Sequence, residues 1–162
     1  RVTGVDFSIV PSLSAMTVQT AISECGINPA ARFPNEHRYA SWLGLPPNNK
    51  KTGGNVFSTK TRHRPSPTGT ALRLAAQSLL SSKSVLGDRF RRLRARLGAP
   101  KAITAMAHLL AKLIYRGLTR GQVYLEAGLA ALQDQSRSNT LLALHRRAHR
   151  LGFELTPLQK TA

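Results

Sequence analysis

Apolar residues recur every three or four positions along most of the chain, and this spacing limits the possible fold more than any other feature. One turn of an α-helix takes about 3.6 residues, so such a series places its members on one helix face. Three successive series are Leu72, Ala75, Ala76 and Leu79; Leu86, Phe90, Leu93 and Leu97; and Ile103, Met106, Ala107, Leu110 and Ile114. The third begins after Pro100, a residue that favours the first turn of a helix. The sequence therefore predicts a mostly α-helical protein.

Further helices are predicted toward both ends of the chain. Near the N-terminus one face is formed by Met16, Val18, Ile22 and Cys25, and a second by Tyr39, Trp42 and Leu43. Asn35 is the expected N-cap of the second helix, and Gly44 marks its end. Near the C-terminus a weaker helix is expected over residues 122–132, and a last helix is defined by Leu141, Leu144, Ala148 and Leu151.

Residues 45–69 differ from both flanks. They contain four prolines and three glycines, and only Val56-Phe57 suggests a short strand or a packed loop. A segment of this length without helical spacing is usually functional or disordered. The fold prediction is a helical domain with a long Pro/Gly-rich basic loop between N-terminal and C-terminal helices, and a short strand pair within the loop is left open. We expect a core unit over residues 1–80 and a helical extension over residues 81–162.

Positive charge is concentrated in and after this loop. The chain has 24 Lys and Arg against 7 Asp and Glu, a net charge of +17, and thirteen of the basic residues lie between Lys50 and Lys101. Such a localised excess favours nucleic acid as a partner over a small metabolite or an extracellular substrate. No apolar stretch is long enough to cross a membrane, and a single cysteine, Cys25, fits a reducing compartment. Neither membrane binding nor secretion is expected.

Two groups of basic residues are candidates for contacting phosphates. The first lies on the arginine-rich helix: Arg89, Arg91, Arg92, Arg94 and Arg96. Guanidinium groups along one helix suit a nucleic-acid backbone, and a solvated helix face is the alternative. The second alternates with hydroxyl residues in the loop: Lys60, Arg62 and Arg64. A basic linker without fixed structure is the alternative for this group.

The third candidate is the run Lys50, Lys51, Thr52, Gly53 and Gly54. Glycines let backbone amides approach a phosphate, lysines supply charge, and the hydroxyl could attack a phosphodiester. A polar turn that contains Gly-Gly is the other interpretation.

A metal site has less support from the sequence. His145 and His149 lack a third ligand nearby, and no two carboxylates lie within a helical turn of each other. We expect no cofactor in this chain.

Several short segments also follow one another in a recognisable order. They are Gly4-Val5-Asp6 with Val10-Pro11, Ser23-Glu24-Cys25-Gly26, Arg32-Phe33-Pro34, Ala40-Ser41-Trp42-Leu43-Gly44-Leu45, Lys51-Thr52-Gly53-Gly54, and the stretches 71–79, 91–98 and 100–105. Each is weak alone. Their order and spacing resemble the C-terminal portion of insertion-sequence family 110 transposases, which are RNA-guided DNA recombinases.

The resemblance implies DNA strand cleavage and rejoining by the intact protein. Members of that family carry an N-terminal RNase H-like domain with acidic metal ligands, and a serine before Gly-Gly is taken to attack DNA. In this chain Thr52 stands at the position that resembles the serine, the acidic domain and its divalent metal are missing, and Pro11-Ser12-Leu13-Ser14 replaces a glycine-containing hairpin. These departures indicate a truncated or decayed copy. Residues 1–80 would form the core of its transposase domain.

By this resemblance the chain is the DNA-binding C-terminal part of an insertion-sequence transposase, cytoplasmic and associated with a prokaryotic nucleoid. The expected partners are DNA, a structured guide RNA and, in the intact protein, further copies of the chain. Alone it is expected to bind nucleic acid without recombining DNA. Two alternatives stay open: a non-catalytic RNA- or DNA-binding module, and a helical protein-interaction domain with incidental charge.

Overall fold

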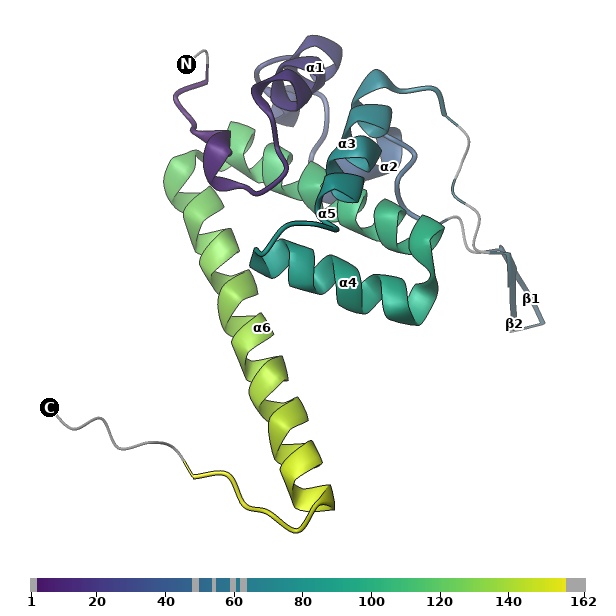
Figure 1. The fold of residues 1–162 in the computed structure, drawn as a ribbon. Coiled ribbons are helices and arrows are strands. Elements are labelled where there is room, and N and C mark those ends of the chain that lie inside the picture. Colours follow the sequence, from purple (N-terminus) through teal and green to yellow (C-terminus); the bar gives the residue numbers. More distant parts are fainter. Residues whose placement is uncertain (1–2, 48–49, 54, 59–60, 62–63, 157–162) are drawn as a thin grey trace, which may run out of the picture.

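The computed structural model describes residues 3–47, 50–53, 55–58, 61 and 64–156, and most of these residues are helical (Figure 1). The prediction of a mostly α-helical fold is therefore confirmed. In chain order the elements are the 3-10 helix η1 (Phe7–Ile9), α1 (Ala15–Cys25), the 3-10 helix η2 (Pro29–Ala31), α2 (Glu36–Trp42), β1 (Lys50–Thr52), β2 (Asn55–Ser58), α3 (Pro67–Ser78), α4 (Val85–Leu97), α5 (Ala99–Arg120) and α6 (Gln122–Arg150).

Helix α5 is the centre of the fold. Helices α2, α3, α4 and α6 all pack against it, and α1 packs on α3 (Figure 1). The buried positions of α5 recur at helical spacing: Ala102, Met106, Ala107, Leu110, Ala111, Leu113, Ile114, Tyr115 and Gly117. The core also takes Leu72 and Leu79 from α3, and Leu86 and Phe90 from α4. One hydrophobic core thus joins helices on both sides of residue 80.

Local capping explains where the helices begin. The side chains of Ser14, Asn35, Ser66 and Ser84 each accept a hydrogen bond from the backbone N–H three residues later, at the starts of α1, α2, α3 and α4. This bond satisfies an amide that the first turn of a helix leaves without an intrahelical partner. The predicted role of Asn35 as an N-cap is confirmed.

Single glycines join the last three helices. Gly98 lies between α4 and α5, and Gly121 lies between α5 and α6, with φ angles of 80° and 81°. Residues with a Cβ rarely adopt such positive φ values, whereas glycine does so without steric cost. These two positions therefore allow each helix to end and the next to begin at a sharp angle.

A two-stranded antiparallel hairpin, β1–β2, interrupts the helices between α2 and α3. Thr52 pairs with Asn55 at its tip, and an isolated bridge joins Pro47 to Thr61 nearer the helices. Strand β2 contains Val56-Phe57, for which the sequence left a strand or a packed loop open. The hairpin projects from one side of the helical body (Figure 1).

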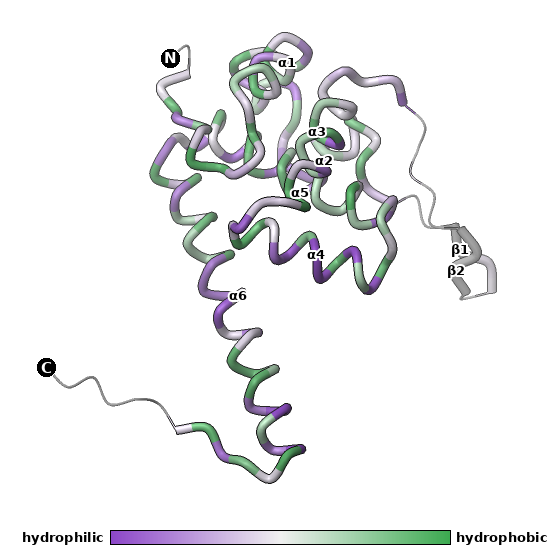
Figure 2. Tube along the Cα trace, in the orientation of Figure 1, coloured by the Kyte–Doolittle hydropathy of each residue, from purple (hydrophilic) through white to green (hydrophobic). Residues whose placement is uncertain are grey.

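The C-terminal region differs from the sequence prediction of two helices. The structure has one continuous helix there, α6, with 29 residues, or roughly 43 Å at 1.5 Å per residue. The reason is that no proline or glycine lies between residues 129 and 151 to stop it. Its second half leaves the helical body, so Leu141, Leu144 and Leu151 are exposed (Figures 1 and 2).

Two more apolar residues of the expected faces lie at the surface. Met16 is exposed because the buried side of α1 runs through Thr17, Val18 and Ala21 instead. Leu97 is exposed because it is the last residue of α4, beside the Gly98 joint. Helical spacing identified the helices correctly in both cases, but not which end residues find a neighbour.

Candidate nucleic-acid interface

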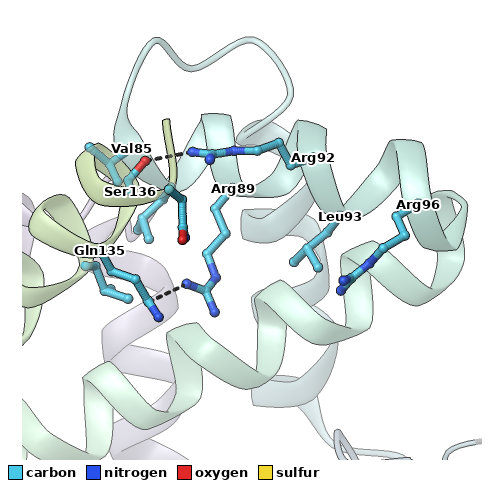
Figure 3. Close-up of a pocket in the computed structure, with 10 residues that line it drawn as sticks. Val85, Arg89, Arg92, Leu93, Arg96, Gln135 and Ser136 are labelled. Carbon is cyan, nitrogen blue, oxygen red and sulfur yellow. Dashed lines mark hydrogen bonds between the residues drawn. The ribbon is translucent and has the colours of Figure 1, made fainter. Parts of the chain in front are cut away.

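Helix α4 divides its surface between the core and a basic face. Leu86 and Phe90 are buried, and arginines occupy much of the remaining surface. Three of these arginines line a pocket of about 320 Å³ between α4 and α6 (Figure 3): Arg89, Arg92 and Arg96. Their spacing of three and four residues keeps them on one side of the helix. The structure thus brings together three of the five arginines that the sequence suggested.

Uncharged groups of α6 hold two of these arginines. Arg89 Nη1 donates to Gln135 Oε1 at 3.3 Å, and Arg92 Nη2 donates to Ser136 Oγ at 2.7 Å (Figure 3). A neutral acceptor orients a guanidinium without cancelling its charge. Each guanidinium has five N–H donors, so several remain for another ligand. The α4–α6 pocket is therefore positively charged and presents oriented donors.

The other two arginines of α4 lie outside the pocket. Arg91 Nη1 donates to the backbone carbonyls of Leu80 and Ser82 at 3.0 and 2.7 Å, and Nη2 forms an ion pair with Asp88. These bonds tie α4 to the turn that follows α3. Arg94 is exposed, and its side chain makes no hydrogen bond or ion pair within the described part of the chain. Arg91 and Arg94 thus have different surroundings, although the sequence pattern predicts the same role for both.

Five of the loop residues that are predicted to contact phosphates are described only in part or lie outside the described residues. Only the backbone is described for Lys50 and Lys51, which belong to β1. Gly54, Lys60 and Arg62 lie outside the described residues. The proposed phosphate contacts of these five residues stay predictions.

Thr52 lies at the tip of the β1–β2 hairpin. It is exposed, it pairs with Asn55, and Gly53 after it has a φ of 56°. A two-residue hairpin loop needs positive φ at its centre, which explains glycine in this position. The pairing agrees with the interpretation as a polar turn, and it also leaves the Thr52 hydroxyl accessible to a large substrate.

Arg64 contacts an aromatic ring where the chain returns from the hairpin to α3. Its Cζ lies 4.9 Å from the centre of the Trp42 ring, and the Cζ of Arg32 lies 4.8 Å from the same centre. Both arginines are exposed, and Trp42 is half-buried. The sequence pattern predicted a packing role for Trp42 and placed Arg32 in one of the ordered segments, without a phosphate contact for either residue. No local pattern reveals this group, because its three members are far apart in the chain.

Two carboxylates serve the fold rather than a shared site. Glu24 Oε2 accepts hydrogen bonds from Ser66 Oγ at 3.0 Å and from the N–H of Thr68 at 2.9 Å, at the start of α3. Glu36 forms a two-point ion pair with Arg116, and this hydrogen bonding lowers the pKa of Glu36. Among the residues that the structure describes, no group of three or more His, Cys, Asp or Glu could hold a metal ion.

Three of the histidines and the cysteine lie in different parts of the fold. His145 and His149 are exposed on the free half of α6. His108 is half-buried on α5, and desolvation lowers its pKa. Cys25 is buried, and desolvation raises the pKa of its thiol. Since the thiolate is the reactive form, Cys25 is a packing residue.

None of the described helices is long and apolar enough to span a membrane.

In a comparison with known families, residues 7–91 match the model described as transposase, IS116/IS110/IS902 family. The matched region runs from η1 into α4; it includes Thr52, Arg64 and Arg89 and ends before Arg92 and Arg96. No curated protein and no solved structure matches the chain.

Proposed function

The chain belongs to the IS116/IS110/IS902 family of transposases, whose model covers just over half of it, and from this premise we propose that it binds DNA for transposition. The principal contact is the α4–α6 pocket. One observation carries the proposal: Arg89, Arg92 and Arg96 converge there beside uncharged residues of α6. Duplex DNA, which carries about one negative charge per 1.7 Å of axis, is the polyanion that transposition brings to such a site.

Arginine suits this role for two physical reasons. Its planar guanidinium can donate two parallel hydrogen bonds to one phosphate. Side chains already oriented by Gln135 and Ser136 also lose less conformational freedom when the phosphate binds. Each neutralised phosphate releases counterions, so log affinity falls with log salt with a slope of about −0.9 per contact. Three contacts would contribute a slope of roughly −3.

The test is the binding of a short fluorescent duplex, followed by anisotropy over a salt series. We expect Arg89→Gln, Arg92→Gln and Arg96→Gln each to weaken binding and to reduce the salt slope by about 1. Arg94→Gln is the matched control, because it removes the same charge from the same helix outside the pocket. Its effect should be distinctly smaller.

Two results would count against this proposal. Equal losses in all four variants would mean that the overall charge of α4, rather than the pocket, binds DNA. Binding that is absent at low salt would leave the helical protein-interaction domain as the better explanation. An RNA of the same sequence, tested in the same assay, separates DNA from a guide RNA as the preferred partner. A cytoplasmic, nucleoid-associated location would follow from DNA binding.

By the family resemblance, Thr52 is the proposed nucleophile of the intact enzyme. Its oxygen would attack the phosphorus of a phosphodiester and lose its proton. The bond from phosphorus to one deoxyribose oxygen would break, and that oxygen would leave as a hydroxyl. The exposed position of Thr52 at the hairpin tip supports this role. The extra methyl group of threonine restricts the rotamer, so Thr52→Ser in the intact enzyme should form the covalent protein–DNA adduct faster, and Thr52→Ala should form none.

Alone, this chain is proposed to bind DNA without cleaving it. Among the described residues its acids form no group of three or more that could hold a metal ion: Asp6, Glu24, Glu36, Asp88, Glu126, Asp134 and Glu154. Metal-assisted phosphoryl transfer needs carboxylates close enough to share the metal ions. Incubation of the purified chain with Mg²⁺ and duplex DNA should leave the DNA intact. A covalent adduct that disappears in Thr52→Ala would overturn this proposal.

A second candidate function, self-association, is favoured by the free half of α6. Large apolar side chains are exposed there: Leu141, Leu142, Leu144 and Leu151. Contiguous exposed apolar surface is typical of association sites, and a second copy of the chain is the proposed occupant. Light scattering should show a mass that rises with concentration, and Leu141→Ser with Leu144→Ser should abolish the rise. A monomer at every concentration would contradict self-association.

A further inference from the structure

Trp42 is the outer member of an aromatic cluster. Its ring centre lies 5.1 Å from that of Phe33 and 6.4 Å from that of Tyr39, and Tyr39 packs in turn on Tyr115. Phe33, Tyr39 and Tyr115 are buried, whereas Trp42 is half-buried. The cluster therefore fixes an indole ring at the last residue of α2, close to where the chain leaves the helices for the hairpin.

Two guanidinium groups are held against this ring. Because the Cζ atoms of Arg32 and Arg64 lie 4.8 and 4.9 Å from its centre, the two cations are within about 10 Å of each other. An aromatic face attracts a cation through its quadrupole. The N–H donors of a guanidinium lie in its own plane, so contact with a ring leaves them available at the edge. The ring thus orients two arginines without using their donors.

Neither arginine of this pair forms an ion pair within the described part of the chain. The ion pairs found there involve neither Arg32 nor Arg64. Glu24 of α1 uses Oε2 to accept hydrogen bonds from Ser66 and Thr68 at the start of α3. Two like charges within about 10 Å of each other repel, whereas a nearby anion is attracted by both. The arrangement therefore favours a negatively charged ligand.

We propose that Arg32 and Arg64, oriented by Trp42, form a second phosphate-binding site for the DNA backbone at the base of the β1–β2 hairpin. Phosphates follow one another about every 3.4 Å of axis along one strand. Two cations no more than about 10 Å apart can therefore engage phosphates that lie close together on the same strand. The Pro47–Thr61 bridge lies between Trp42 and Arg64 in the chain and marks the hairpin base. DNA held there would pass beside the element that carries Thr52. The site rests on the proposed DNA binding, and it shares no residue with the α4–α6 pocket.

Trp42 provides a direct test, because it is the single tryptophan of the chain. A short labelled duplex is titrated into the protein, and DNA anisotropy and tryptophan fluorescence are recorded together. We expect the fluorescence to change in a saturable way with the same midpoint as the anisotropy, and to recover when salt is added. Arg32→Gln and Arg64→Gln should each weaken binding roughly threefold to tenfold, lower the salt slope by about 1 and reduce the fluorescence change.

Matched variants keep the two sites apart. Arg94→Gln removes one exposed charge from α4, a helix that carries none of Arg32, Trp42 and Arg64, and should keep the full fluorescence change. Arg92→Gln should weaken binding but reach the same fluorescence change at saturation. Circular dichroism confirms that each variant is folded.

Three outcomes would overturn the inference. If Arg32→Gln and Arg64→Gln bind with unchanged affinity and slope while tryptophan fluorescence stays constant, the second site is absent and the α4–α6 pocket stands alone. If the wild-type chain binds no duplex, the proposed DNA binding fails as well. If RNA produces the fluorescence change at much lower concentration than DNA, the phosphates bound at Trp42 belong to RNA.

Discussion

The hydroxyl of Tyr115 donates a buried 2.7 Å hydrogen bond to the backbone carbonyl of Phe33, which lies 82 residues earlier in the chain. The bond joins α5, at the centre of the core, to the segment between η2 and α2. Phe33 directly follows Arg32, so the same bond fixes the backbone from which Arg32 reaches the Trp42 ring. The group formed by Arg32, Trp42 and Arg64 is therefore connected to the hydrophobic core.

Tyr115→Phe should lower the free energy of unfolding by about 1–3 kcal/mol, because the carbonyl of Phe33 would remain buried without its partner. Urea denaturation measures the change. The control is Tyr124→Phe, since the Tyr124 hydroxyl bonds with the exposed Arg120 among the described residues, and a change of about 0.5 kcal/mol or less is expected there. Equal denaturation midpoints for the two variants would contradict the prediction.

Gly117→Ala should destabilise the protein although alanine favours helices. A Cβ at Gly117 would lie 2.6 Å from Cε1 of Phe7, so the ring or the helix would have to move. Overpacking of this kind costs about 1–3 kcal/mol. At Gly128, also inside a helix, a Cβ would come no closer than 3.8 Å to a neighbour, so Gly128→Ala should stabilise by up to about 1 kcal/mol. Thermal melts of the two variants should shift in opposite directions, and a shift in the same direction would refute this account.

Part of the acid sensitivity of the fold should come from Glu36. Hydrogen bonding from Arg116 lowers the pKa of Glu36 in the folded chain, so below the ordinary value of about 4.3 the unfolded chain binds more protons. The stabilisation is then fully present above that value and is lost as pH falls through the folded-state pKa. Glu36→Gln should remove this part of the pH dependence in denaturation curves, whereas Glu126→Gln, at an exposed position, should retain it. An unchanged acid limb in Glu36→Gln would exclude this role.

Arg91→Gln should affect stability more than DNA binding. Loss of its bonds to Leu80, Ser82 and Asp88 should cost about 1–2 kcal/mol. Arg92→Gln should do the reverse and weaken duplex binding with little change in the denaturation midpoint. Urea denaturation and anisotropy on the same preparations separate the two effects. If Arg91→Gln weakens binding as strongly as Arg92→Gln while it remains folded, both arginines contact DNA.

The helical framework could be predicted from sequence because helix formation depends on residues within about four positions of one another. The role of Asn35 as an N-cap, the buried face through Leu72 and Leu79, and the inward face through Met106 and Leu110 all follow from such local relations. The same reasoning was wrong for the end of the chain. The spacing of Leu141, Leu144 and Leu151 marks a helix face correctly, but no other element reaches it within the described residues.

The sequence by itself determined that this chain is helical, that its positive charge is concentrated between Lys50 and Lys101, and that Thr52 precedes a Gly-Gly pair. Only the tertiary structure decided which cations lie together. Arg91 and Arg92 are neighbours in the chain, yet Arg91 donates to a backbone carbonyl in the turn after α3, whereas Arg92 lines the α4–α6 pocket. The physical reason is that a side chain's partners depend on contacts across long sequence separations, as between Trp42 and Arg64. Periodicity and charge report only what lies within a few residues.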